Sequence, residues 1–289
     1  MAGTRIDGNE VAKSVKARVK EAVAVIKGQG ISPCLATILV GDNPASATYV
    51  RNKHKACEDV GILTRDHKLD SSITQGEFDR VIEELNQDSL VHGILVQLPL
   101  PAQLDEFAST SRISPLKDVD GLTPHNAGLL AANKAVLVAC TPSGIMEIFE
   151  YYNINLDGKN VVVINRSSLV GKPLCHLLLE KNATVIMCHS KTRNLAGVCQ
   201  SADVIITAVG DRTRFTLTPE MIKEGAIVID VAISRFNDKL AGDADYDGII
   251  QKASFASPVP GGVGPMTVAM LLRNTVTAAS LSSQIGRQS

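Results

Sequence analysis

The sequence predicts an α/β protein made of two domains. Its 289 residues exceed the length at which one hydrophobic core usually stops growing. Unbroken apolar runs alternate with segments of helical periodicity, which is typical of a parallel sheet covered by helices. This series occurs twice, before and after Thr141-Pro142. We therefore expect one domain over residues 1–140, a second over 141–266, and a helix over 267–289 that packs back on the first domain.

The first series opens with a helix, because apolar residues recur at helical spacing over residues 11–26. We expect Asp7 to cap this helix, and Gly28 and Gly30 to end it. The next run is apolar throughout, which favours a strand buried on both faces. The series is then predicted as strand 34–40, helix 45–60 after Pro44, strand 63–69, helix 77–86 and strand 93–96.

The second series has the order of a doubly wound nucleotide-binding domain. It begins with a helix and the β-branched run at 161–164. A long apolar helical stretch with no following strand closes the chain. The remaining elements are predicted as helices at 143–152, 170–180 and 267–280, and strands at 184–187, 204–207 and 226–230.

Composition excludes several classes of protein. The formal net charge is −1, so no basic excess indicates nucleic acid or a membrane surface. No apolar run is long enough to cross a bilayer, and the polar first nine residues lack the apolar core of a signal peptide. A cytoplasmic protein is the simplest interpretation. The six cysteines contain no CxxC pair and the histidines no HExxH pair, so we predict buried thiols and no metal site.

A dinucleotide site is predicted after the strand at 161–164. There a tight loop leads into a helix, whose free N–H groups and positive dipole end suit a phosphate. Gly171 is the only glycine of the loop, so the GxGxxG pattern is absent. Asn165 stands at the strand end and tolerates a left-handed backbone. An ordinary strand-to-helix turn is the alternative.

The next strand end favours NADP over NAD. NAD-binding domains usually place an acid there, about 20 residues on, to bind the ribose hydroxyls. Residues 188–193 contain no acid but include Lys191 and Arg193. Together with Arg166 they suit a 2′-phosphate, and Arg166 and Ser190 are the strongest candidates. The alternative for Lys191 and Arg193 is that they are ordinary solvated residues of the surface.

Candidate catalytic residues lie in the first series. Tyr49 and Lys53 share one helix face at i and i+4, and a lysine in such a place can be made less basic for proton transfer. Gln97 follows a buried strand, where parallel sheets place ligand contacts. Asp120 precedes Gly121 and can bind a donor-rich heterocycle through charge-assisted hydrogen bonds. Each residue also has a structural alternative. Lys53 would be a surface lysine beside a half-buried tyrosine, Gln97 a loop amide, and Asp120 part of a capped turn.

A Gly/Pro-rich stretch at 257–267 lets the backbone approach a ligand closely, or serves as a linker. Taken with the segments above, it makes the chain resemble the bifunctional methylenetetrahydrofolate dehydrogenase/cyclohydrolase family. The matching segments keep the family's order and cover nearly the whole chain. They are residues 49–57, 93–101, 117–122, 140–144, 166–173, 188–192 and 258–267.

The resemblance implies a Rossmann-like NADP-binding domain, tetrahydrofolate derivatives as substrates, and a homodimer. It implies that Lys53 is the lysine used in hydrolysing the methenyl intermediate, and that Gln97 contacts and tunes it. Asp120 matches the acid that holds the pterin ring, and Tyr49 the aromatic that stacks on the aminobenzoate. Further substrate contacts are implied for Pro260, Gly261 and Gly262, and cofactor contacts for Thr141, Asn165, Arg166, Ser167, Val170, Gly171, Ser190 and Ile233.

The sequence departs from the family beside the expected cofactor. Asn165 stands where glycine is usual, and residues 231–234 stand where Gly-Ile-Asn is usual. A monofunctional dehydrogenase, and a non-catalytic folate or dinucleotide binder suggested by Asn165 and Ala232, are the alternatives. The intact set Tyr49, Lys53 and Gln97 favours the bifunctional enzyme. Because a cationic lysine opposes the cationic intermediate, we expect Lys53 to be made less basic or directed by Gln97.

Overall fold

The computed structural model describes residues 2–236 and 239–285, which form two compact units. One comprises Met1–Lys13 and Thr141–Thr267 and is called the six-stranded unit. The other, the three-stranded unit, comprises Ser14–Cys140 and Val268–Ser289. The chain crosses between them inside helices α1 (Gly8–Gly28) and α10 (Gly264–Ile285) and at the start of α6 (Cys140–Tyr151).

The domain limits therefore differ from the predicted ones at the N-terminus. Strand β1 (Thr4–Arg5) pairs with β11 (Phe255–Ala256), which places the first residues in the six-stranded unit. The two-residue strands are too short for any periodic signal, so only the pairing reveals them. Asp7 caps α1 as expected, because its Oδ1 accepts from the amides of Asn9 and Glu10 at 2.9 and 3.3 Å.

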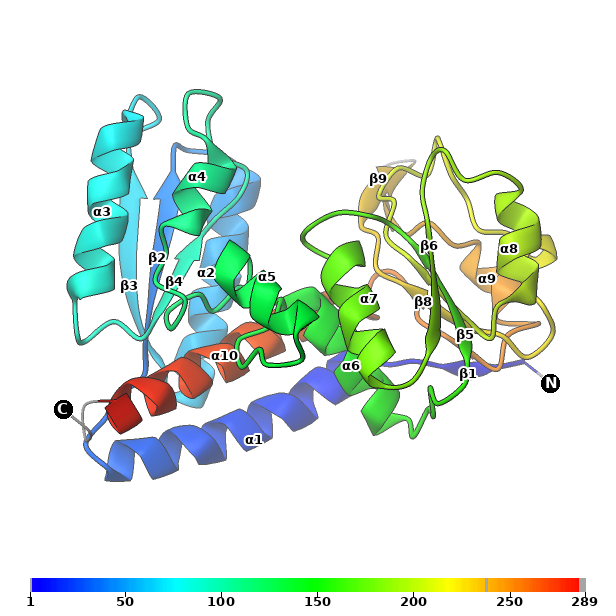
Figure 1. Cartoon of the computed structure of the whole chain (residues 1–289), viewed down its shortest axis with the longest axis horizontal. Helices are drawn as coiled ribbons and strands as arrows, with labels where there is room; N and C mark the ends of the chain where they lie inside the picture. The colour runs from blue at the N-terminus through cyan, green and yellow to red at the C-terminus, as the bar shows by residue number, and fades with distance from the viewer. Residues whose placement is uncertain (1, 237–238, 286–289) are drawn as a thin grey trace. The chain divides into compact units, whose positions relative to one another are not determined.

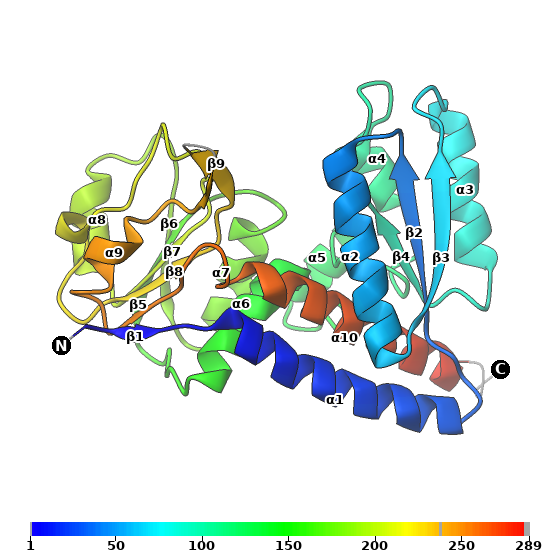
Figure 2. The same ribbon diagram turned by 180° about the vertical axis from the view of Figure 1, so that it is seen from behind.

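The three-stranded unit is a parallel sheet in the order β3-β2-β4, with bounds equal to those predicted. The central strand β2 (Cys34–Val40) is buried throughout, since strands pair with both of its edges and helices cover both faces. Figures 1 and 2 show α2 (Pro44–Val60) and α3 (Gln75–Gln87) on opposite sides of this sheet. The remaining elements are β3 (Leu63–Leu69), β4 (Gly93–Val96), α4 (Glu106–Ser111) and α5 (Pro124–Ala131).

Local sequence signals fix the ends of these helices. Asn43 caps α2 by accepting from the amides of Ala45 and Ser46, and Pro44 occupies the first turn. The helix ends at Gly61, whose left-handed backbone has φ 83°. Helix α3 starts with a capping box between Thr74 and Glu77. Its apolar face packs on the sheet through Phe78, Ile82 and Leu85.

The last helix closes the three-stranded unit through one buried amide. Asn274 is 3% exposed, and its Nδ2 donates to the carbonyls of Val119 and Val138, each at 2.9 Å. Both carbonyls belong to the loops on either side of Gly121, where a Cβ atom would lie 2.4 Å from backbone atoms of Val138 and Ala139. Helix α10 therefore supports the turn that contains Asp120.

We expect Asn274→Ala to destabilise the protein by about 2–4 kcal/mol, because two buried carbonyls lose their donor. Denaturant unfolding of the protein measures this loss. Thr277→Ala, one turn further along the same helix, is the matched control and should change stability by about 0.5 kcal/mol or less. An Asn274→Ala variant as stable as the control would show that the amide does not support the turn.

The six-stranded unit has the order β1-β11-β8-β7-β5-β6, with every pair parallel. From β5 (Asn160–Ile164) the chain passes through α7 (Gly171–Glu180) to β6 on one side. It then returns through α8 to β7 on the other side. Figure 2 shows α7 on one side of the strands and α8 on the other. The remaining elements are β6 (Thr184–Cys188), α8 (Leu195–Ser201), β7 (Val204–Thr207), η1 (Pro219–Met221), β8 (Ile227–Asp230) and α9 (Tyr246–Ile249).

The strand order reverses between β5 and β7, and ligands of open α/β sheets bind at such a point. The predicted doubly wound topology is therefore confirmed. A hairpin of β9 (Ser234–Phe236) and β10 (Lys239–Ala241) follows β8 and lacks any apolar periodicity that could have predicted it. All six cysteines are buried free thiols, as expected. Within the described ranges, no helix has the length and apolar character needed to cross a membrane.

Candidate active site

Lys53 and Gln97 meet at the carboxyl edge of the three-stranded sheet. Lys53 lies on α2, which follows β2, and Gln97 follows β4 directly. The Lys53 Nζ donates to the Gln97 Oε1 at 3.0 Å. Gln97 is itself fixed, since its backbone amide donates to the Ile38 carbonyl at 2.9 Å and its Nε2 to the Leu98 carbonyl at 2.8 Å. Of the two expected ways to control Lys53, the structure shows the contact with Gln97.

A histidine that sequence reasoning missed holds this part of α2 against the sheet. The Nε2 atom of His54 lies 3.2 Å from the Thr37 hydroxyl and 2.8 Å from the Asp66 carboxylate. Thr37 and Asp66 are register partners on β2 and β3, so one ring spans two strands. Thr37 is the one polar side chain within the buried run Cys34–Val40, which was the available signal.

The segment around Asp120 contains one functional candidate between structural residues. Lys117 donates through Nζ to the carbonyls of Leu85, Asn86 and Asp88 at 2.7–2.9 Å, so it caps the end of α3. Asp118 is buried and accepts from the Thr123 amide at 2.8 Å and from other donors of the same turn. Among the described residues of this segment, Asp120 is the acid that lacks such a set of structural donors.

The surroundings of Asp120 shift the pKa of its carboxyl. Burial raises the pKa of its carboxyl, and the neighbouring Asp118 acts in the same direction. The Lys53 ammonium and a hydrogen bond from Cys140 oppose this rise. Burial and the Asp120 charge raise the pKa of the Cys140 thiol well above its ordinary value, so Cys140 remains a neutral donor. The charges of Lys53 and Asp120 therefore act on one another across the site.

Tyr49 completes this group on the same face of α2 as Lys53. Its side chain is 54% exposed, whereas Val50, the next residue, is buried. An aromatic ring so exposed is available to stack on a flat ligand. The three-stranded unit thus contains Tyr49, Lys53, Gln97 and Asp120, with Lys53 linked to Gln97 by a hydrogen bond and to Asp120 by charge.

The other predicted substrate residues lie in a pocket of the six-stranded unit. This pocket of about 380 Å³ contains Pro260, Gly261 and Gly262 together with Ile233. Gly261 has φ +99°, a backbone conformation that requires glycine. Asp230 also lines the pocket, at the end of β8. The structure thus brings one predicted cofactor residue, Ile233, beside the predicted substrate residues of the Gly/Pro-rich stretch.

Two buried acids hold loops of the six-stranded unit, and one of them, Asp230, lines this pocket. Asp230 accepts from the amides of Ala232 and Ala244 at 3.1 and 2.7 Å. Asp243 accepts from the amides of Val209 and Gly210 at 2.7 and 3.0 Å, and from the Thr207 hydroxyl at 2.6 Å. Burial raises the pKa of Asp230 to about 6, and the charge of Asp243 adds to the rise. In the sequence the two acids are isolated residues, and nothing there predicts that they act as a pair.

The predicted dinucleotide loop lies at the carboxyl edge of the same sheet. Ile164 and Cys188 are register partners at the ends of β5 and β6, so Arg166 and Ser190 emerge from adjacent strands. Both side chains are exposed. Asn165 does not take the positive φ that was considered for it. Its side chain instead accepts from Ser167 and Gly171, and Val170 donates to the Ser167 hydroxyl.

Thr141, the remaining predicted cofactor residue, is where the chain re-enters the six-stranded unit after Cys140. Its hydroxyl lies 2.9 Å from that of Thr267, where the chain leaves the unit again. The donors that suit NADP are therefore the N-terminus of α7, the Arg166 guanidinium and the Ser190 hydroxyl. They fit a group with a pyrophosphate and a 2′-phosphate.

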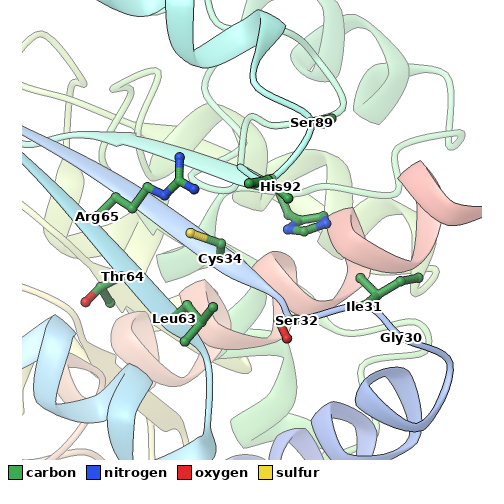
Figure 3. Close-up of a pocket in the computed structure, with 10 residues that line it drawn as sticks. Gly30, Ile31, Ser32, Cys34, Leu63, Thr64, Arg65, Ser89 and His92 are labelled. Carbon is green, nitrogen blue, oxygen red and sulfur yellow. The ribbon is translucent and has the colours of Figure 1, made fainter.

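A different pocket lies at the opposite, amino edge of the three-stranded sheet. Figure 3 shows Cys34, Arg65 and His92 along this cavity of about 460 Å³. Helices α1 and α3 end near it, and helix C-termini carry negative partial charge. None of the residues predicted for substrate or cofactor lines it. The candidate site of the three-stranded unit therefore lies at the carboxyl edge of its sheet and not in this pocket.

Comparison with protein families decides the assignment of the whole chain. Residues 6–120 match the model described as tetrahydrofolate dehydrogenase/cyclohydrolase, catalytic domain. Residues 139–283 match the NAD(P)-binding domain of the same family. The chain belongs to the tetrahydrofolate dehydrogenase/cyclohydrolase family. It is therefore an enzyme with both activities that uses NADP, and its match to the NAD(P)-binding domain covers residues 139–283.

Relatives of the tetrahydrofolate dehydrogenase/cyclohydrolase family match over nearly their whole length. The Bifunctional protein FolD of Nitrosopumilus maritimus is 76% identical over 287 residues, covering 99% of this chain and 100% of the relative. That of Moorella thermoacetica is 50% identical over 275 residues, covering 95% and 98%. The predicted family and bifunctional activity are confirmed.

Solved structures of the tetrahydrofolate dehydrogenase/cyclohydrolase family share the fold. The Campylobacter jejuni bifunctional FolD enzyme has a TM-score of 0.94 and 45% identity, covering 97% of this chain and 99% of that one. The Trypanosoma brucei enzyme, complexed with NADP cofactor and inhibitor, has a TM-score of 0.93 and 37% identity, covering 98% and 99%. The predicted two-domain α/β fold and NADP as cofactor are also confirmed.

Proposed function

We propose that one folate site, built from Tyr49, Lys53, Gln97 and Asp120, serves both reactions of this enzyme. The enzyme oxidises 5,10-methylenetetrahydrofolate to 5,10-methenyltetrahydrofolate with NADP and hydrolyses the product to 10-formyltetrahydrofolate. The observation that supports one site is the 3.0 Å contact between Lys53 and Gln97, together with the Lys53 charge acting on the half-buried Asp120 carboxyl. In this proposal the three-stranded unit, residues 14–140 completed by helix α10, forms the folate-binding domain.

Each residue then has a distinct task in the hydrolysis. Asp120 accepts the N–H donors of the pterin ring, and Tyr49 stacks on the aminobenzoate. Water adds to the methenyl carbon, which is cationic because the adjacent nitrogens share its charge. Lys53 takes the proton that the added water loses, and Gln97 holds the Lys53 amine in place by accepting a hydrogen bond from it. The bond between the reacting carbon and one of its two nitrogens then breaks. That nitrogen gains a proton and the new hydroxyl loses one to become the formyl carbonyl, so one proton is released overall. Proton transfer by a positioned group contributes about 10² to 10⁴ in rate.

The oxidation needs chiefly positioning of the reacting carbon. NADP, when bound, accepts the hydride that this carbon loses. We propose that Arg166 and Ser190 bind its 2′-phosphate and that the loop containing Ser167, Val170 and Gly171 faces its phosphates. Thr141, Ile233 and the backbone of Pro260–Gly262 complete the contacts along residues 141–267. The supporting observation is that Arg166 and Ser190 follow the ends of two paired strands.

We also propose that the enzyme is a cytoplasmic homodimer. The hairpin β9–β10 leaves apolar side chains exposed at Phe236 and Leu240, which is the composition of a surface that a second copy covers. Sedimentation of the purified protein should give twice the mass of 30.7 kDa. A mass of one chain at micromolar concentration would contradict this assembly.

A spectroscopic assay tests the proposed activities directly. Methylenetetrahydrofolate with NADP should produce NADPH absorbance, and NAD in a parallel cuvette should react more slowly. Methenyltetrahydrofolate should disappear faster with the enzyme than without it. No turnover with either dinucleotide would refute the dehydrogenase, and a rate equal to the uncatalysed one would refute the hydrolase.

A further inference from the structure

The Asn165 side chain spans the crevice where the strand order reverses. β5 and β7 are neighbouring parallel strands, and the chain leaves them toward opposite sides of the sheet. Asn165 follows β5, and its Nδ2 donates to the carbonyl of Ala208, which follows β7, at 2.6 Å. One side chain therefore ties together the two loops that border the expected dinucleotide crevice.

The carboxamide oxygen of Asn165 holds the rest of the loop. It accepts from the amide and the hydroxyl of Ser167, both at 2.7 Å, and from the amide of Gly171 at 3.0 Å. The Ser167 hydroxyl accepts in turn from the Val170 amide at 3.1 Å. A helix N-terminus usually offers such N–H groups to an anion, but here a side chain of the protein occupies one of them. The backbone is thereby fixed on both sides of Arg166.

We propose that Asn165 is a positioning residue that orders the loop 165–171, so that Arg166 is placed for the 2′-phosphate before NADP binds. The inference rests on the proposed role of Arg166. A loop that is already ordered loses little conformational entropy when the ligand binds, so the ligand binds more tightly. A glycine at this position could make none of the four side-chain contacts and would add backbone freedom. Asn165 therefore acts on the choice between NADP and NAD without touching the 2′-phosphate.

Equilibrium binding of NADP and of NAD to the enzyme, followed by titration calorimetry, tests this role. Asn165→Ala should raise the Kd for NADP about tenfold, the factor that about 1.4 kcal/mol of lost ordering produces. The Kd for NAD should rise about threefold or less, because NAD has no group for Arg166 to bind. Asn165→Gly should weaken NADP binding further. Unchanged or tighter NADP binding, or an equal loss for both dinucleotides, would overturn the proposal.

Two other variants separate the causes. Asn155 lies in the same unit in the turn before β5, at the amino edge of the sheet, and its side chain accepts from the Asp157 amide at 3.0 Å, so Asn155→Ala removes a comparable contact away from the loop. It should lower thermal stability while both Kd values stay unchanged. Arg166→Ala should abolish the preference for NADP; if the preference persists, the proposed role of Arg166 fails. If it is lost in Arg166→Ala but kept in Asn165→Ala, only the role of Asn165 fails.

Discussion

Lys53→Met should lower the rate of methenyltetrahydrofolate hydrolysis by about 10² to 10⁴, the usual contribution of a positioned proton-transfer group. Methionine keeps much of the length and the apolar stem of lysine, so packing on α2 is preserved. It cannot carry a proton, and the Gln97 Oε1 loses its donor at 3.0 Å. NADP reduction should stay within about tenfold of the unmodified enzyme, because hydride loss depends chiefly on positioning. Both rates can be followed in one spectrophotometer.

The matched control for this variant is Lys55→Met. Lys55 lies two residues further along α2, so it faces a different side of the helix, and it is exposed. Its substitution should leave both rates unchanged. Gln97→Ala should slow hydrolysis, since the amine loses the group that directs it. Full hydrolysis by Lys53→Met would remove Lys53 from the mechanism, whatever the behaviour of the dehydrogenase.

Strands buried on both faces were predictable because their signal is local. The runs at Cys34–Val40, Gly93–Val96 and Val204–Thr207 have the predicted bounds, since continuous apolar sequence can be satisfied only inside a covered sheet. Strands β1, β9, β10 and β11 have two or three residues each and were not predicted. Strands β1 and β11 exist because partner strands distant in sequence supply their hydrogen bonds, whereas β9 and β10 are a short hairpin that pairs with itself.

The sequence was enough to propose Tyr49, Lys53, Gln97 and Asp120 as the candidate site, but not the residues that support them. Asp118 and Asp120 are equivalent in the sequence, and only the donors around Asp118 show which acid is structural. Asn274 lies 155 residues from Val119, the carbonyl that it binds. A polar residue within the apolar run of α10 was its only signal. For Asn165 the sequence suggested backbone tolerance, whereas the structure shows a side-chain network that a one-dimensional pattern cannot contain.

Asp120→Asn should raise the KM for the folate substrate about ten- to a hundredfold in both reactions, because charge-assisted hydrogen bonds to the pterin become neutral ones. Both activities should fall together if one site serves both. The variant should be at least as stable as the unmodified enzyme at pH 7.5, since burial raises the pKa of Asp120 and makes its charged form costly. Thermal unfolding and the two assays measure these quantities.

The raised pKa also fixes the sign of a pH effect on stability. Between the ordinary value of 3.8 and the raised value, the folded protein holds a proton that the unfolded chain has released. The contribution of Asp120 to stability is therefore complete below the ordinary pKa and declines as pH rises through the raised one. Asp120→Asn should remove this decline. Asp118→Asn should instead lower the stability of the protein by about 1–3 kcal/mol, because the donors around Asp118 lose an acceptor. Equal stability losses in the two variants would show that Asp120 is a second structural acid and not the group that holds the substrate.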